Sequence, residues 1–352
     1  MKALTFQGID SVSHETVPDP RIEDPGDVVV RVECAGICGS DLHVYHGRET
    51  GLDLGTVMGH EFVGEIAETG AEVRGIVAGD RVVSPFTTSC GRCFYCKRGL
   101  TARCTAGQLF GWVEGGGGLH GCQADYVRVP LAGSTLVKVP EGVAAEQALF
   151  AGDILSTGYF CADLAGIEPG SVVVVLGCGP VGLMAAIGAQ ELNAGRVFAV
   201  DAVAERLELA KRFGAEPLEL AGDPVAVVHE ATEGRGADAV LEVVGSPEAT
   251  RLAVDLVRPG GSIAAAGVHT EKQFAFSPVE AYDKNLTYRA GRCPARHYME
   301  RVLPIVEAAR YDLAAVISHR LPLAEGARGY DIFARKLDGC TKVILTPPPG
   351  SP

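Results

Sequence analysis

The first 154 residues carry short apolar runs near turn-forming segments. The runs Val28–Val32, Phe62–Ile66 and Arg81–Val83 are rich in valine and other residues that favour β-strands. Asp24–Gly26 and Ala78–Asp80 combine aspartate with proline or glycine, a pattern typical of turns. This part of the chain therefore predicts a β-rich, partly barrel-like domain.

Between about residues 155 and 292 the apolar runs alternate with segments of helical periodicity. Ser171–Leu176 is almost continuously apolar, as a strand of a parallel sheet covered on both faces is. A predicted helix over Val181–Leu192 follows it, and an amphipathic helix over Ala204–Phe213 comes later. Further strands are predicted at Arg196–Val200, Ala239–Val244 and Ser262–Ala266. This alternation predicts an α/β fold with a doubly wound parallel sheet.

The last part of the chain, from about residue 293 to 352, contains a predicted helix over Tyr298–Arg310 and an apolar strand over Lys342–Thr346. The uncharged run 171–190 has the length of a membrane span. Glycines and Pro180 interrupt this run, and a strand, a turn and a helix account for it better. We therefore expect no membrane association.

Composition narrows the class of protein. The chain has 352 residues, which at roughly 150 residues per domain predicts about two domains. Apolar residues make up 47% and charged residues 21%, which excludes an intrinsically disordered chain. The chain has 31 lysines and arginines and 44 aspartates and glutamates, which gives a formal net charge of −13. This excess of negative charge argues against binding to nucleic acid.

The chain contains 11 cysteines, and this odd number disfavours a fold held together by disulfide bonds. The first residues reach Asp10 before an apolar run builds, so they do not resemble a secretory signal. We therefore expect a cytoplasmic protein with reduced thiols, which serve as metal ligands, catalytic groups or small buried residues.

A glycine-rich turn predicts a dinucleotide site. The segment 177–182 reads G-x-G-x-x-G, follows a predicted strand and opens a predicted helix. Asp201 follows at the end of the next strand, where its carboxylate would bind ribose hydroxyls and repel a 2′-phosphate, so we expect NAD rather than NADP. Arg206 is close enough in sequence to weaken that preference. The expected residues of the turn are Gly177, Gly179, Pro180, Val181 and Gly182.

Four cysteines within one short segment predict a structural metal site. Cys90, Cys93, Cys96 and Cys104 have the short spacings with which one loop wraps a zinc ion. A closed shell of four thiolates leaves no open position, which is why the site is interpreted as structural. An iron–sulfur cluster and unmetallated thiols remain as alternatives.

A second set of potential metal ligands is dispersed along the chain. Cys38, His60 and Asp153 offer a thiol, an imidazole and a carboxylate, which as three protein ligands would leave zinc an open position. Sequence spacing alone does not join them. Cys38 and His60 are alternatively core residues, and Asp153 is alternatively a helix N-cap.

Seven segments, in their order and at their intervals, resemble the zinc-dependent medium-chain alcohol dehydrogenase family over nearly the whole chain. They are GICGSDLH (36–43), GHEFVG (59–64), the four-cysteine segment (90–104), GDILSTGY (152–159), GCGPVG (177–182), VDAVAERL (200–207) and TKVIL (341–345).

This resemblance implies a role for individual residues. It makes Cys38, His60 and Asp153 the ligands of a catalytic zinc, with Glu61 near the metal. It implies that Ser40 takes the alcohol proton, that His43 passes it to solvent and that Asp41 orients His60, although Ser40 and His43 are alternatively polar surface residues. Thr157 and Val244 match positions near the nicotinamide, and Lys342 matches a basic residue that meets the cofactor pyrophosphate. We expect only structural roles for His46, His120, His269 and His297 and for the other six cysteines.

The resemblance also implies an overall organisation. A β-rich GroES-like catalytic domain would comprise residues 1–154 and 293–352, and a Rossmann-type NAD-binding domain residues 155–292. The implied enzyme holds one catalytic and one structural zinc per chain and is a homo-oligomer, with a tetramer favoured.

The implied reaction is hydride transfer between a primary or secondary alcohol and NAD, which gives an aldehyde or a ketone. A polyol, sugar-alcohol or L-threonine dehydrogenase and a formaldehyde dehydrogenase are alternatives within the family. A zinc-free quinone or enoyl reductase would lack Cys38, His60 and the four cysteines. A protein that binds the dinucleotide without turnover would need neither Ser40 nor an open metal site.

Overall fold

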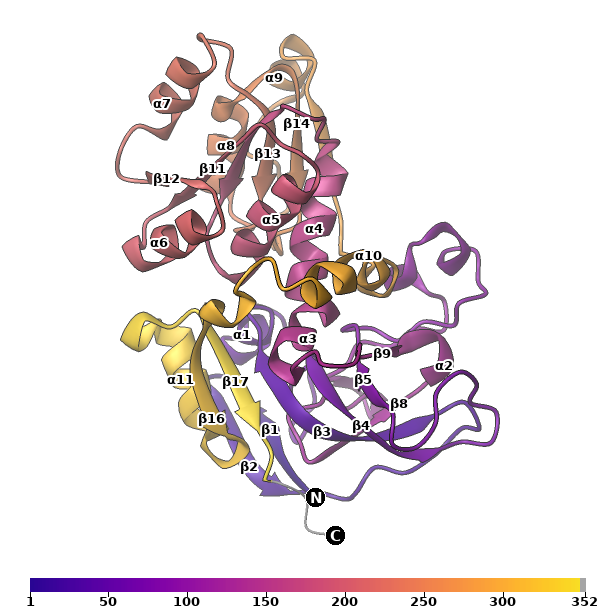
Figure 1. The fold of residues 1–352 in the computed structure, drawn as a ribbon. Helices are drawn as coiled ribbons and strands as arrows, with labels where there is room; N and C mark the ends of the chain where they lie inside the picture. Colours follow the sequence, from indigo (N-terminus) through magenta and orange to yellow (C-terminus); the bar gives the residue numbers. More distant parts are fainter. Residues whose placement is uncertain (349–352) are drawn as a thin grey trace. The chain divides into compact units, whose positions relative to one another are not determined.

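The computed structural model describes residues 1–348 and divides into two units (Figure 1). Unit 1 comprises Met1–Asp153 and Pro294–Pro352, of which residues 349–352 lie outside the described part. Unit 2 is the intervening segment, Ile154–Cys293. Unit 1 is thus assembled from both ends of the chain.

The main sheet of unit 1 joins strands from the two ends of the chain. Its order is β16-β17-β3-β4-β5-β9, and β8 pairs with β3 outside this path. The strands are β3 (Val28–Ile37), β4 (Phe62–Thr69), β5 (Arg81–Val83), β8 (Tyr126–Val129), β9 (Val137–Lys138), β16 (Ile317–Pro322) and β17 (Lys342–Thr346). Antiparallel pairing of β17 with β3 sets Ile344 opposite Gly36 and Val343 opposite Ile37. Lys342 is thereby placed beside the end of β3.

Two hairpins and several short helices complete unit 1. The hairpins are β1 (Lys2–Gly8) with β2 (Ser11–Thr16) and β6 (Trp112–Glu114) with β7 (Gly117–Leu119). The α-helices are α1 (Asp41–Tyr45), α2 (Ala132–Thr135), α3 (Ala145–Gly152), α10 (Ala295–Glu307) and α11 (Gly326–Arg335). The 3-10 turns are η1 (Cys96–Arg98), η2 (Thr101–Arg103), η3 (Leu313–Val316), η4 (Leu323–Glu325) and η5 (Leu337–Gly339). One apolar cluster of this unit gathers side chains from β1, α1, α11 and β17, among them Leu4, Tyr45, Tyr330 and Val343.

Unit 2 is built on a six-stranded parallel sheet in the order β12-β11-β10-β13-β14-β15. Its strands are β10 (Val172–Leu176), β11 (Arg196–Asp201), β12 (Glu216–Glu219), β13 (Ala237–Glu242), β14 (Val257–Ala265) and β15 (Thr287–Ala290). Strands β11, β12, β13 and β14 are labelled in Figure 1. The central strand β10 is buried from Val173 to Leu176, as expected when helices cover both faces of the sheet. The order of strands reverses at β10, from which one half of the sheet runs to β12 and the other to β15.

The first helix of unit 2 precedes its first strand, and the other helices connect successive strands. They are α4 (Ile154–Ala165), α5 (Pro180–Glu191), α6 (Ala204–Arg212), α7 (Pro224–Ala231), α8 (Pro247–Leu256) and α9 (Pro278–Asp283). The uncharged run 171–190 folds as strand β10, a turn and helix α5. In the part of the chain from residue 1 to 348, no helix is long and apolar enough to cross a membrane.

Candidate active site and metal centres

The end of β3 and the short helix α1 present Cys38, Ser40, Asp41 and His43. The backbone N–H of Asp41 donates to the carbonyl of Cys38 at 3.2 Å, and that of His43 donates to the carbonyl of Ser40 at 3.1 Å. The carboxylate of Asp41 turns back and accepts the N–H of Cys38 at its Oδ2 atom, at 2.9 Å. These bonds fix the turn that carries Cys38.

His60 divides its two ring nitrogens between different partners. Its Nδ1 atom lies 3.1 Å from Oδ1 of Asp41. Its Nε2 atom lies 3.4 Å from Oδ2 of Asp153 and 3.3 Å from Oγ of Ser40. Asp41 therefore orients the imidazole so that Nε2 faces the other candidate ligands.

The candidate ligands of the dispersed set meet in unit 1. One ligand atom each from Cys38, His60, Glu61 and Asp153 lies within 4.8 Å of all the others, and all four residues are buried. Cys38 Sγ is 3.4 Å from Asp153 Oδ2. Asp153 occupies the single position between α3 and α4, so the chain's path between these helices delivers its carboxylate.

The electrostatics of this cluster favour a cation. Burial and the neighbouring carboxylates of Asp153 and Glu61 raise the pKa of the Cys38 thiol to about 11. Burial by itself would lower the pKa of His60, but the charge of Asp41 and the hydrogen bonds that the ring donates to Asp153, Asp41 and Cys38 raise it well above its ordinary value. A thiolate at Cys38 therefore needs a positive ion beside it, and the sulfur, nitrogen and oxygen donors present are those that bind zinc.

Glu61 adds a second carboxylate to the cluster and forms a buried ion pair. Its Oε2 atom accepts from Nζ of Lys342, which also donates to the carbonyl of Ile37 at 3.1 Å. Glu61 and Lys342 are each 1% exposed. The Oε1 atom of Glu61 is buried without a hydrogen-bond partner among residues 1–348, which fits a carboxylate beside a metal. A Cβ atom on Gly36 would lie 2.1 Å from Glu61 Oε2, so this pair requires glycine at position 36.

Ser40 and His43 are placed differently with respect to the cluster. Ser40 Oγ lies 3.3 Å from Cys38 Sγ and equally far from Nε2 of His60, so the hydroxyl is beside the candidate ligands. His43 stands one helical turn further on, and its Nδ1 atom is buried without a hydrogen-bond partner among the described residues. Burial lowers the pKa of His43, so its imidazole is neutral near pH 7 and can accept a proton.

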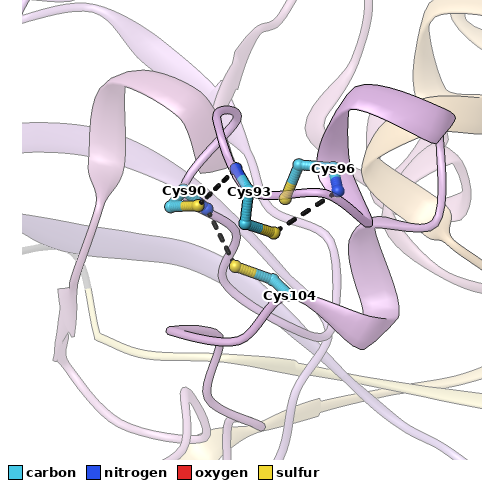
Figure 2. A group of neighbouring side chains, drawn as sticks. All are labelled: Cys90, Cys93, Cys96 and Cys104. Atoms are coloured by element: carbon cyan, nitrogen blue, oxygen red, sulfur yellow. Dashed lines mark hydrogen bonds between the residues drawn. The ribbon is translucent and has the colours of Figure 1, made fainter.

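The four clustered cysteines form a separate group in unit 1 (Figure 2). One Sγ atom from each lies within 4.8 Å of the other three. Backbone N–H groups point at the sulfurs: that of Cys90 donates to Cys104 Sγ at 3.2 Å, and that of Cys93 to Cys90 Sγ at 3.4 Å. Backbone hydrogen bonds, from Cys96 above all, lower the pKa of Cys93 to about 6. Four convergent sulfurs with N–H donors fit a closed tetrathiolate site.

In unit 2 the three glycines of the turn have distinct structural tasks. Gly177 adopts a φ of 90°, which favours glycine. A Cβ on Gly182 would lie 1.7 Å from the carbonyl oxygen of Gly177, so strand and helix can approach only with glycine there. A Cβ on Gly179 would meet nothing within 4 Å. The N-terminus of α5, with Pro180 and Val181 in its first turn, is thus open where a pyrophosphate would bind.

Asp201 is the last residue of β11 and joins this turn to the next helix. Its Oδ2 atom accepts the N–H of Cys178 at 2.6 Å, and its Oδ1 atom accepts that of Val203 at 2.9 Å. Nη1 of Arg206 lies 3.9 Å from Oδ2 of Asp201. The carboxylate of Asp201 and the guanidinium of Arg206, the two groups expected to influence cofactor choice, are therefore neighbours.

Glu242, the last residue of β13, belongs to none of the motifs in the sequence. The predicted strand ran on to Val244, but the carboxylate of Glu242 ends it earlier by binding the N–H groups of Val244 and Gly245 at its Oε1 atom, each at 2.8 Å. Its Oε2 atom pairs with Nε2 of His269 at 2.7 Å, and the carboxylate is fully buried. An acidic residue that directly follows the apolar run Ala239–Leu241 is the signal that could have identified it.

The remaining histidines and cysteines are placed as follows. His46 pairs with Asp10, and His120 accepts the N–H of Val57. A Cβ atom on Gly99 of the four-cysteine segment would lie 3.0 Å from the ring of His297. Thr157 lies on α4 and is half-buried. The cysteines outside the two clusters are all buried: Cys34, Cys122, Cys161, Cys178, Cys293 and Cys340.

Comparisons with known proteins agree with this geometry. The family "Alcohol dehydrogenase GroES-like domain" matches residues 24–141, and the family "Zinc-binding dehydrogenase" matches residues 180–308. The chain is 44% identical to a zinc-type alcohol dehydrogenase B of Aspergillus flavus, over 95% of this chain and 78% of that protein. It is 38% identical to an uncharacterized zinc-type alcohol dehydrogenase-like protein of Bacillus subtilis, over 99% of this chain and 100% of that protein.

A solved structure shows the same similarity. The alcohol dehydrogenase TADH from Thermus sp. ATN1 is 41% identical, with a TM-score of 0.93 over 99% of this chain and 100% of that one. Together these matches confirm the predicted fold class, a Rossmann-type parallel sheet with a GroES-like domain. The chain therefore belongs to the zinc-dependent medium-chain alcohol dehydrogenase family of oxidoreductases.

Proposed function

We propose that this protein is an NAD-dependent alcohol dehydrogenase that oxidises primary or secondary alcohols to aldehydes or ketones. Unit 1 is the catalytic domain and holds two zinc ions, one structural at the four cysteines and one catalytic at Cys38, His60 and Asp153. Unit 2 is the NAD-binding domain. The observation that carries the proposal is the convergence of thiol, imidazole and carboxylate in one buried cluster with a serine hydroxyl beside it.

The chain's own residues account for the movement of the proton. A zinc ion held at the three ligands supplies a Lewis acid that makes an alcohol hydroxyl more acidic. Ser40 Oγ, beside Cys38 and His60, accepts that proton as its own hydroxyl proton passes onward. His43, one turn further along α1, receives it on a neutral imidazole and releases it to solvent.

The residues of unit 2 account for binding of the redox cofactor. NAD supplies the acceptor for the hydride that leaves the alcohol carbon, so each turnover converts alcohol and NAD⁺ into carbonyl product, NADH and one proton. The open backbone at Gly179 and the N-terminus of α5 receive the pyrophosphate. Asp201 binds the adenosine ribose, and its negative charge disfavours the 2′-phosphate of NADP.

The test combines metal analysis with a substrate panel. Purified protein is assayed with primary and secondary alcohols, polyols, L-threonine and formaldehyde, each with NAD and with NADP. We expect turnover of simple alcohols with NAD. Turnover of only a polyol, threonine or formaldehyde would overturn the assigned substrate class.

Two matched cysteine variants test the catalytic metal site. Cys38→Ala should abolish turnover and remove about one zinc per chain, because it deletes one of three protein ligands. Cys34→Ala, at a buried cysteine of β3, the strand that leads to Cys38, lies outside both clusters and should keep activity and metal content. Full activity and metal content in Cys38→Ala would refute the site.

A further inference from the structure

Two buried polar residues outside the candidate ligand set are connected to it by hydrogen bonds. Gln123 precedes β8, Tyr330 lies on α11, and both are 0% exposed. The hydroxyl of Tyr330 donates to Oε1 of Gln123 at 2.9 Å. The last helix of unit 1 is thereby linked to a segment that comes about 200 residues earlier.

The side-chain amide of Gln123 has its other end at the candidate site. Its Nε2 atom donates to the carbonyl of Gly36 at 3.0 Å and to Oδ2 of Asp41 at 3.4 Å. The opposite orientation would set the amide oxygen against a carbonyl and a carboxylate, which are both acceptors. The bonds to Gly36 and Asp41 therefore fix which way the amide points, and they leave Oε1 for the hydroxyl of Tyr330.

Asp41 connects Gln123 to two of the candidate metal ligands through hydrogen bonds. Its Oδ2 atom accepts from Gln123 and from the N–H of Cys38, and its Oδ1 atom pairs with Nδ1 of His60. Gln123 also fills the space beside Gly59, where a Cβ would lie 2.4 Å from its Cγ atom. One side chain thus contacts the residue before His60 and holds the carboxylate that orients the His60 ring.

We propose that Gln123 and Tyr330 are a positioning pair for the catalytic metal, acting through Asp41 on His60 and Cys38. This inference rests on the proposed zinc site. Groups that orient metal ligands from outside the ligand set typically change metal affinity by about 10- to 100-fold. The pair also ties α11, near the end of the chain, to the metal site.

The main test is metal affinity, measured by competition between a chelator and the Cys38 site, with Cys38→Ala as the reference for what the four cysteines retain. Tyr330→Phe keeps the ring, which lies 5.4 Å from that of Tyr45, and removes only the hydroxyl. We expect about 10-fold weaker zinc binding in Tyr330→Phe and up to about 100-fold weaker binding in Gln123→Met. Tyr288→Phe, at a half-buried tyrosine of β15 in unit 2 that packs against Phe274 and Phe276, is the matched control and should bind zinc as the wild type does.

A double variant separates positioning from a purely structural role. In Tyr330→Phe with Gln123→Met no polar atom of the pair is left unpaired, so thermal stability should recover toward the wild type while zinc binding stays weak. A cobalt-loaded sample should show a shifted visible spectrum in the same variants, because the geometry around the metal changes.

Each outcome bears on a different claim. Wild-type zinc affinity in both single variants, or recovery of affinity in the double variant, would overturn the positioning pair while leaving the zinc site intact. If wild-type protein holds no more metal than Cys38→Ala, the proposed function itself fails and the positioning pair fails with it.

Discussion

At the scale of single residues, two side chains of the candidate metal site each bind two different partners through their two polar atoms. His60 directs Nδ1 to Asp41 and Nε2 to the ligand cluster, and Asp41 in turn serves both His60 and the backbone of Cys38. Buried polar groups of this kind cost free energy unless each atom is paired, and a pairing that satisfies both ends also fixes the orientation of the ring. The hydrogen bonds of Asp41 to His60 and to the backbone of Cys38 therefore have two effects. They offset the free-energy cost of burying the Asp41 carboxylate, and they fix the geometry around Cys38.

His43 is expected to act as the base that receives the proton. Burial lowers the pKa of His43, so the neutral form dominates at pH 7 and is lost only as the pH falls through that lowered value. We expect His43→Gln to reduce kcat for alcohol oxidation about 100-fold at pH 7, the lower end of what a positioned acid–base group contributes. The deficit should shrink toward pH 9, because hydroxide can then take the proton from Ser40. Steady-state rates from pH 6 to 9 measure this.

The matched control for His43 is another histidine of the same segment. His46 follows α1 directly and pairs with Asp10 at 2.6 Å, so His46→Gln should leave the pH profile unchanged. Equal deficits at pH 7 and pH 9 in His43→Gln would show that this residue does not relay the proton.

Asp201 is expected to decide between the two dinucleotides. Removal of its charge takes away the repulsion of a 2′-phosphate, and Arg206 at 3.9 Å becomes free to bind that phosphate. We expect Asp201→Ser to raise the ratio of kcat/KM for NADP to that for NAD about 10-fold or more, equivalent to at least roughly 1.4 kcal/mol. Asp223→Ser removes a helix-capping carboxylate of the same unit and should leave the ratio unchanged. An unchanged ratio in Asp201→Ser would mean that another group discriminates.

At the scale of elements, a buried carboxylate at the C-terminal end of β13 fixes the turn that follows the strand. Glu242 is fully buried, yet its carboxylate accepts two backbone N–H groups and pairs with His269. These bonds hold the turn that carries Val244, whose side chain is 52% exposed. An exposed apolar residue on a rigid turn at the carboxyl end of a parallel strand is suited to contact a ligand there.

A graded pair of substitutions at Glu242 tests this turn. Glu242→Ala leaves the N–H groups of Val244 and Gly245 without their acceptor. We therefore expect the free energy of unfolding to fall by about 2–3 kcal/mol. We also expect NAD to bind at least about 10-fold more weakly. Glu242→Gln keeps one acceptor oxygen and should retain most of the affinity. Titration of NADH fluorescence and thermal unfolding measure the two effects. Wild-type NADH affinity in Glu242→Ala would show that the turn does not contribute to binding.

Sequence motifs could group the members of a candidate site only where these residues are close together in the chain. The turn 177–182 and the cysteines of 90–104 are contiguous motifs, and the structure gathers both. Cys38 and Asp153 are 115 residues apart, and only resemblance to a family joined them. Gln123, Tyr330 and Glu242 belong to no motif, because each meets its partner only through tertiary packing. The sequence around a single polar residue does not indicate which distant group will be its hydrogen-bond partner.

At the scale of the whole molecule, sheet topology explains why residues from both ends of the chain share one site. Because β17 pairs with β3, Lys342 reaches Glu61 and the carbonyl of Ile37. Because α11 packs in the apolar cluster that contains Tyr45 and Val343, Tyr330 can reach Gln123. Residues that follow unit 2 in the chain therefore pack around candidate metal ligands that precede unit 2.

The four-cysteine segment is expected to owe its order to metal rather than to apolar packing. Phe94, Tyr95 and Leu100 of this segment are 59%, 39% and 45% exposed, so burial of apolar surface contributes little to its stability. We expect Cys104→Ala to destabilise unit 1 by at least about 3 kcal/mol, a fall in Tm of roughly 6–12 °C. Limited proteolysis should then cut within residues 90–104, while NADH binding by unit 2 is unchanged. Cys293→Ala, at a buried cysteine outside both clusters, should leave the proteolysis pattern as it is in the wild type. A protease-resistant segment in Cys104→Ala would show instead that protein contacts alone hold these residues in place.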